Sequence, residues 1–258
     1  MQATFLLNTK AEFLKTKRTA ALWLTVIGAT FIPLVNFIRL MARPKYIIPY
    51  MHKDPWAITI KENWEISSLF LLPMFVILVT SLIVQVEYRN NTWKQVYASP
   101  RSYVDIFFSR FIAIHAMILL CFVLFTVSIL FFSCLAQFFY PGYEFFSHPV
   151  PWADLFDITS RLYFAVISIT AIQYWLSLRF KNFIAPLGVG LALLITGLII
   201  HQWEKLYVYP YMYPAIAYLK TFNKNPGFIQ KANLFNLLWF VGVLLLAFFD
   251  MVKRKERG

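Results

Sequence analysis

Three adjoining segments decide the fold of this chain: SSLFLLPMFVILVTSLIVQV at 67–86, EYRNNTWKQVYASPRSYVDI at 87–106 and FFSRFIAIHAMILLCFVLFTVSILFF at 107–132. The first and third segments are almost entirely apolar, and each reaches the roughly 20 residues that a helix needs to cross a bilayer. The middle segment is polar and aromatic, with a proline at position 100. The pattern predicts two membrane-spanning helices joined by a short polar loop.

The composition extends this prediction to the whole chain. Of its 258 residues, 60% are hydrophobic and 14% are charged, against roughly 25% charged residues in soluble domains. Continuous apolar runs favour helices, because the strands of a membrane barrel alternate in short pieces. We therefore expect an all-α integral membrane protein with a single membrane domain over residues 1–258. Six spans are predicted, at 20–40, 67–86, 107–132, 162–178, 183–200 and 232–249.

The net charge of +12 follows the predicted topology. Lysine and arginine gather before the first span, between the second and third, between the fourth and fifth, and after the sixth. A Lys/Arg excess marks the cytoplasmic side of a membrane protein, so both termini are expected to be cytoplasmic in a multi-pass protein of the cell inner (cytoplasmic) membrane. The same distribution favours membrane lipid, and no nucleic acid, as the partner of the positive charge.

Residues 1–18 form an amphipathic pattern ahead of the first span. Apolar side chains share one arc at the helical period, whereas Glu12 and Lys15 fall opposite, and Lys17 and Arg18 follow as basic residues. The pattern predicts an interfacial helix on the inner leaflet. The alternative is a short frayed tail that supplies anchoring charge.

The loop at 87–105 contains two helix-start signals. Thr92 and Gln95 fit a capping box, in which the hydroxyl accepts from the third backbone N–H and the amide reaches back. Pro100 ends that helix, because the residue before a proline is driven out of helical geometry. Ser102 and Asp105 form a second capping-box pattern directly before the third span. We expect a very short helix, a corner and a new helix start.

Small and aromatic residues mark the last third of the chain. Gly188 and Ala192 form a small face on the fifth span that would let another helix approach closely, either in a dimer contact or within the chain. Residues 201–231 are rich in aromatics and are expected to form an outer re-entrant or interfacial loop. This loop is either an aromatic belt or part of a substrate exit. His115 and Gln173 lie inside spans, where we expect them to make structural hydrogen bonds.

The sequence contains no signature of an enzyme. Its histidines, cysteines and acids lack metal-ligand spacing, and no glycine is followed by the Lys-Ser/Thr of a phosphate-binding loop. No nucleophile elbow is present. We therefore predict no catalytic residue, no metal and no cofactor in this chain.

The loop also carries a family resemblance. A glutamate at the end of the second span, then Asn-Asn-Thr-Trp-Lys, then Ser-Pro-Arg before the third, resembles the permease subunits of ABC-2-type transporters. The branch related to bacteriocin- and lantibiotic-immunity permeases is the most similar. The resemblance implies that the loop holds a coupling helix that docks on an ATPase. The matching positions are Glu87, Asn91, Thr92, Trp93, Lys94, Pro100 and Arg101.

The resemblance also implies a function and partners. Two separate ATP-binding-cassette subunits would hold ATP and Mg, and a second permease would complete a homo- or heterodimer. The expected function is export of an amphipathic substrate, namely a peptide, an antibiotic or a lipid. One alternative is a non-transporting membrane sensor or scaffold. Another is a polytopic membrane enzyme acting on lipid, which would need acids or histidines converging at one membrane depth.

Overall fold

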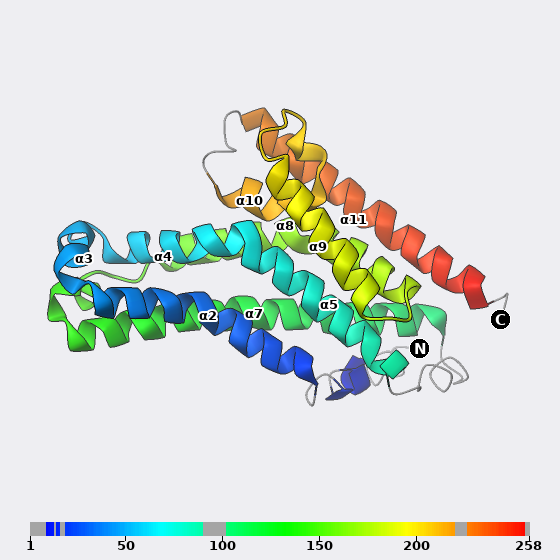
Figure 1. Ribbon diagram of the computed structural model, residues 1–258, viewed down its shortest axis with the longest axis horizontal. Helices are drawn as coiled ribbons and strands as arrows, with labels where there is room; N and C mark the ends of the chain where they lie inside the picture. Colours follow the sequence, from blue (N-terminus) through cyan, green and yellow to red (C-terminus); the bar gives the residue numbers. More distant parts are fainter. Residues whose placement is uncertain (1–8, 13, 16–18, 90–101, 220–225, 256–258) are drawn as a thin grey trace.

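The computed structural model describes residues 9–12, 14–15, 19–89, 102–219 and 226–255 (Figure 1). Within these ranges the chain is helical and contains no β-strand. Several helices run along the long axis, whereas α5 (Leu72–Arg89), α9 (Ile184–Ile199) and α11 (Pro226–Lys255) run obliquely to it (Figure 1).

Five helices in the described ranges are long and apolar enough to cross a membrane. A shorter apolar helix, α9 (Ile184–Ile199), coincides with the predicted fifth span. The all-α membrane fold is thereby confirmed, whereas the count of six spans and the side of the termini stay predictions. The five long helices are Ala20–Ala42, Pro55–Val86, Tyr103–Phe139, Trp152–Arg179 and Gly227–Lys253.

The stretch between the first two predicted spans, for which we predicted no helix, is helical. It folds into α3 (Pro44–Met51) and α4 (Pro55–Ile66). Proline is favoured in the first turn of a helix because it lacks an N–H that would have no partner there. The Asp54 side chain accepts a 2.9 Å hydrogen bond from the N–H of Ala57. These start signals were present in the sequence and we missed them.

The second span is one bent rod made of α4, the π-turn η1 (Ser67–Leu71) and α5 (Leu72–Arg89). At its end the N–H of Leu72 donates to the carbonyl of Ser67, five residues back. The next residue is Pro73, which has no N–H to donate to the preceding turn. The wider turn accommodates this missing donor, and the rod bends there (Figure 1).

The helix α7 (Tyr103–Phe139) is the longest in the described ranges. Its 37 residues span about 55 Å at 1.5 Å per residue, against a hydrocarbon core of about 30 Å. With the far ends of α2 (Ala20–Ala42) and α4 it forms a part that we call the distal arm, residues 36–56 and 132–160. The arm ends opposite the termini (Figure 1).

Aromatic side chains close the tip of the distal arm. The indole Nε1 of Trp56 donates to the carbonyls of Phe145 and His148 at 3.0 and 3.1 Å. The Tyr143 hydroxyl donates to the Leu40 carbonyl at 2.7 Å, and burial raises the pKa of Tyr143 to about 12, so it remains a neutral donor. Tyr143 and Phe145 are both fully buried in the protein.

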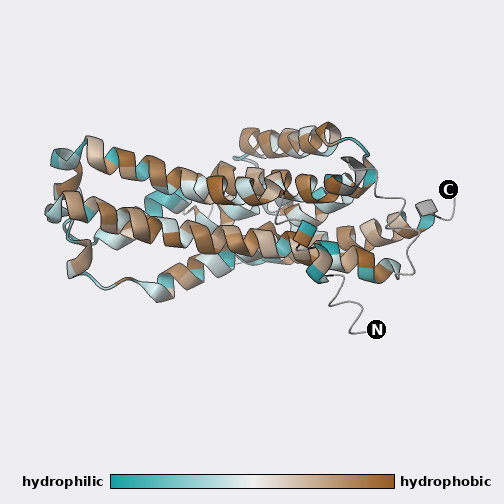
Figure 2. Ribbon diagram, turned by 90° about the horizontal axis from the view of Figure 1, so that it is seen from below, coloured by the Kyte–Doolittle hydropathy of each residue, from teal (hydrophilic) through white to brown (hydrophobic). Residues whose placement is uncertain are grey.

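The helices α8 and α11 differ in how much of their surface is buried. The helix α8 (Trp152–Arg179) is buried continuously from Ser168 to Tyr174, whereas α11 (Pro226–Lys255) leaves most of its apolar surface exposed. Figure 2 shows hydrophobic residues along the helices and hydrophilic residues gathered toward the ends. This pattern fits a protein whose outer surface meets lipid along its length and water at both ends.

Candidate transport core

The predicted coupling loop joins two helices at the end of the bundle that also carries the termini. The helices α5 and α7 and the end of α11 meet there (Figure 1). The Ser102 hydroxyl accepts a 3.0 Å hydrogen bond from the N–H of Asp105, as the second capping box predicts. The backbone of Glu87 lies in α5. The other six predicted coupling residues lie outside the described residues: Asn91, Thr92, Trp93, Lys94, Pro100 and Arg101.

The N-terminal segment is helical where it is described. Residues 9–12 and 14–15 have helical geometry, and Lys15 Nζ lies 2.6 Å from a carboxylate oxygen of Glu12. Glu12 is buried against the rest of the chain. Lys17 and Arg18 lie outside the described residues. The structure therefore brings Glu12 and Lys15 together, in agreement with a helix in this segment.

A buried polar cluster, which we call the Gln173 hub, joins four elements inside the bundle. Gln173 of α8 is 0% exposed. Its Nε2 donates to Ser81 Oγ of α5 at 2.9 Å and to the carbonyl of Pro186 in α9 at 2.8 Å. The hydroxyl of Tyr211, in η5 (Pro210–Met212), lies 3.4 Å from Gln173 Oε1. An amide inside a membrane helix is held by such partners because an unpaired one would be costly.

Glycine at position 190 makes room for the hub. A Cβ placed on Gly190 would lie 2.6 Å from Gln173 Oε1 and 2.8 Å from Ile77 Cγ2. Contacts this short are repulsive, so any larger residue would displace the amide or separate α9 from α5. The backbone of α9 therefore approaches α5 and α8 as closely as a helix can at this point.

The aromatic segment after α9 packs into the protein. It forms η4 (Leu206–Val208), η5 and α10 (Tyr213–Tyr218), and α11 begins at Pro226. Tyr211 and Tyr213 are buried within the protein. The Tyr209 hydroxyl donates to the Leu193 carbonyl at 2.6 Å. This segment thus packs against the C-terminal half of α9. Residues 220–225 lie outside the described residues.

Gly188 and Ala192 lie on the opposite, exposed face of α9. A Cβ placed on Gly188 would have no neighbour within 4 Å, in contrast to Gly190 two residues away. The face that packs within the chain carries Pro186, Gly190 and Gly197 instead. We considered two alternatives for Gly188 and Ala192, a dimer contact and packing within the chain. Among the described residues, the structure does not show packing within the chain at this face.

Three further polar contacts connect α8 to α7 and α11. His115 Nδ1 lies 2.9 Å from the Tyr163 hydroxyl, which agrees with the expected structural histidine. Trp175 Nε1 and Arg179 both contact the carboxylate of Asp250 in α11, each at 3.2 Å. We did not predict the Asp250 contacts. The signal available in the sequence was an acidic residue just before the basic C-terminal tail.

The polar side chains of this core hold the helices in position. In the part of the chain that the structure describes, no group of three or more His, Cys, Asp or Glu could hold a metal ion. The polar contacts fix helices against one another at several depths, and they leave α9 joined to α5 and α8 chiefly through the hub.

Comparison with known proteins identifies the family. A family model described as an ABC-2 family transporter protein matches residues 9–197, which is well over half of the chain. No curated protein sequence matches. The matched range begins at the N-terminal segment, includes the predicted coupling loop and ends within α9. The chain therefore belongs to the ABC-2 transporter family, as a multi-pass permease subunit of an ABC transporter.

Proposed function

We propose that this permease exports an amphipathic substrate, namely a peptide, an antibiotic or a lipid, across the cell inner membrane. Two separate ATPase subunits would bind ATP and Mg and drive the movement through residues 87–105. The observation that carries the proposal is the family match, which includes this loop. The chain would supply the path and its partners the energy.

The helices on either side of the loop support a mechanical coupling. The loop is the direct link between α5 and α7, and the Ser102 cap defines where α7 begins. A continuous helix of 37 residues can carry a displacement from its capped end toward the distal arm. A push on the loop would therefore reach α7 directly, and α5 would transmit it to the Gln173 hub through Ser81.

A dimer contact on α9 is the proposed role of Gly188 and Ala192. Both residues lie on an exposed face, and small residues allow two membrane helices to approach closely. The second permease would be either another copy of this chain or a related one.

We expect Gly188→Leu to weaken association of the two permeases about tenfold or more, because overpacking a close contact costs about 1–3 kcal/mol. The measurement is the dimer fraction after crosslinking in membranes. The matched control is Gly242→Leu on α11, where an added Cβ also has no neighbour within 4 Å. Equal dimer fractions for the two variants would remove Gly188 from the contact.

The proposed orientation predicts which positions an impermeant thiol reagent reaches in intact cells. A single cysteine at Tyr46, exposed on the distal arm, should react from outside. A single cysteine at Lys181, in the turn between α8 and α9, should react only after permeabilisation, and so should one at Asn91. Labelling of position 91 or 181 from outside would contradict the proposed orientation.

Association with an ATPase tests the function itself. A tagged chain purified from its native membrane in mild detergent should bring a nucleotide-binding subunit with it, identified by mass spectrometry. Stimulation of ATP turnover by the substrate would distinguish a transporter from a sensor or scaffold. Recovery of the chain without any nucleotide-binding protein would contradict the proposal.

A further inference from the structure

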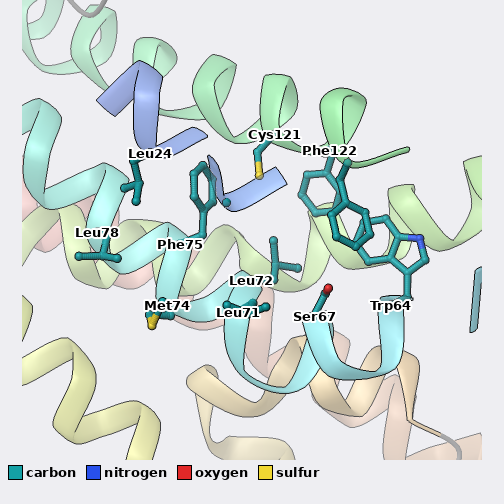
Figure 3. A pocket seen from close by; sticks show the side chains of 12 residues that line it. Leu24, Trp64, Ser67, Leu71, Leu72, Met74, Phe75, Leu78, Cys121 and Phe122 are labelled. Atoms are coloured by element: carbon teal, nitrogen blue, oxygen red, sulfur yellow. The ribbon is translucent and has the colours of Figure 1, made fainter. Parts of the chain in front are cut away.

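A cavity of about 50 Å³ lies between α2, the π-turn η1 with α5, and α7 (Figure 3). Its mouth is formed by half-buried residues of α2 and of the η1–α5 segment, and its floor by buried residues of α4, α5 and α7. The mouth residues are Leu24, Gly28, Leu71, Met74 and Leu78, and the floor residues include Trp64, Phe75, Cys121 and Phe122.

Two local features leave this space open. Gly28 contributes no side chain, and a Cβ placed there would only reach the Phe75 ring at an ordinary 3.4 Å. The π-turn on the opposite wall is wider than an α-helical turn, because the N–H of Leu72 bonds five residues back instead of four. The gap thus lies where a glycine faces a widened turn.

The lining is suited to hydrocarbon and unsuited to water. The hydroxyl of Ser67 is already committed, since it donates to the carbonyl of Asn63 at 2.7 Å. The indole nitrogen of Trp64 points away from the cavity (Figure 3). A cavity without available polar partners stays dry and accepts apolar ligands. The walls therefore gain dispersion contacts only if an apolar group enters.

The position of the mouth determines which apolar group can reach it. Trp23 and Ile27 of α2 and Phe70 of the π-turn are exposed apolar side chains next to the mouth in sequence. In a membrane-spanning protein such a surface is covered by lipid acyl chains. The half-buried residues of the lining thus have exposed apolar neighbours that would meet lipid.

We propose that the cavity binds the methyl end of an acyl chain from a phospholipid of the surrounding bilayer. A volume near 50 Å³ is small, so it accepts the end of a chain and not its full length. The bound chain end fills the space between α2 and α5 at the bend of the second span. The site does not require the transport proposal, because it depends only on the membrane location.

Trp64 provides an intrinsic reporter of this site. It is 1% exposed, so lipid outside the protein does not touch it, yet it lines the cavity. The full-length chain is reconstituted into phosphatidylcholine vesicles whose acyl chains carry bromine near the methyl end, and tryptophan emission is compared with unbrominated vesicles. Subtracting the emission of Trp64→Phe isolates the Trp64 contribution from that of the other tryptophans. Lipid brominated near the headgroup is the matched control.

We expect the Trp64 contribution to be lost in vesicles brominated at the methyl end and retained with bromine near the headgroup. Gly28→Leu, which fills the mouth, should restore the emission, and Met74→Phe on the opposite side of the mouth should do the same. Gly242→Leu should leave the quenching as in the wild type, because that position faces open space. Thermal unfolding verifies that each variant is folded. Undiminished Trp64 emission in the methyl-end vesicles, or equal quenching in both folded mouth variants and the wild type, would overturn the proposal.

Discussion

Replacing Trp93 with alanine is expected to release the ATPase partner while the membrane domain stays folded. Buried aromatic anchors at protein interfaces typically contribute about 2 kcal/mol or more, which corresponds to roughly thirtyfold weaker association. Trp93 follows a predicted helix cap in a loop without an apolar core of its own, so a partner surface is what would bury it. The measurement is the amount of ATPase that copurifies with the tagged permease.

The control for this variant is Trp152→Ala, which removes an exposed tryptophan from the distal arm. It should retain the ATPase at wild-type level. Thr92→Ala should show a milder loss, because a missing helix cap costs about 1 kcal/mol. Wild-type ATPase retention and wild-type transport in Trp93→Ala would exclude this residue from the coupling site.

Gly190→Ala is expected to destabilise the fold by about 2 kcal/mol, whereas Gly188→Ala on the same helix should not. Overpacking typically costs about 1–3 kcal/mol, and here the added Cβ would lie 2.6 Å from Gln173 Oε1. Gln173 cannot move away freely, because its Nε2 is bonded to Ser81 and to the Pro186 carbonyl. At Gly188 the added methyl meets no atom and alanine favours the helix.

The chain contains its own probe of unfolding for this comparison. Cys121 is buried in α7, so a bulky, charged thiol-reactive dye labels it only when the bundle opens. A Cys134→Ser background removes the second, half-buried thiol. Gln173→Ala should reduce the cost of Gly190→Ala, because residues in contact are coupled. Strictly additive effects of the two substitutions, or equal stability of the Gly188 and Gly190 variants, would show that the hub does not constrain α9.

Hydropathy was sufficient to predict the helical membrane class and the approximate place of the five long apolar helices, because a long apolar run is rarely compatible with any other structure. It failed at residues 41–66, where α3 and α4 lie outside the apolar runs. The signals for the start of these helices, Pro44 and Asp54-Pro55, lie in a stretch that contains no long apolar run. The distal arm was missed for the same reason, since its helices extend beyond the length a bilayer requires.

The candidate core was partly accessible from sequence. Gln173 was recognisable as a buried amide, but its partners come from three other elements, and no spacing rule connects them. The roles of Gly188 and Gly190 depend on which face of α9 packs inward. A helix that is apolar on all sides does not reveal this. The π-turn before Pro73 and the cavity beside it likewise depend on how α2, α5 and α7 meet.

The central claim is that this permease depends on separate ATPase subunits for its energy, and ATP hydrolysis tests it most directly. The complex recovered through a tag on this chain and the same chain expressed alone are reconstituted in parallel, and phosphate release is measured. We expect hydrolysis by the complex and none above background by the isolated chain, with turnover in the complex reduced by Trp93→Ala. Robust ATP hydrolysis by the isolated chain would contradict the account.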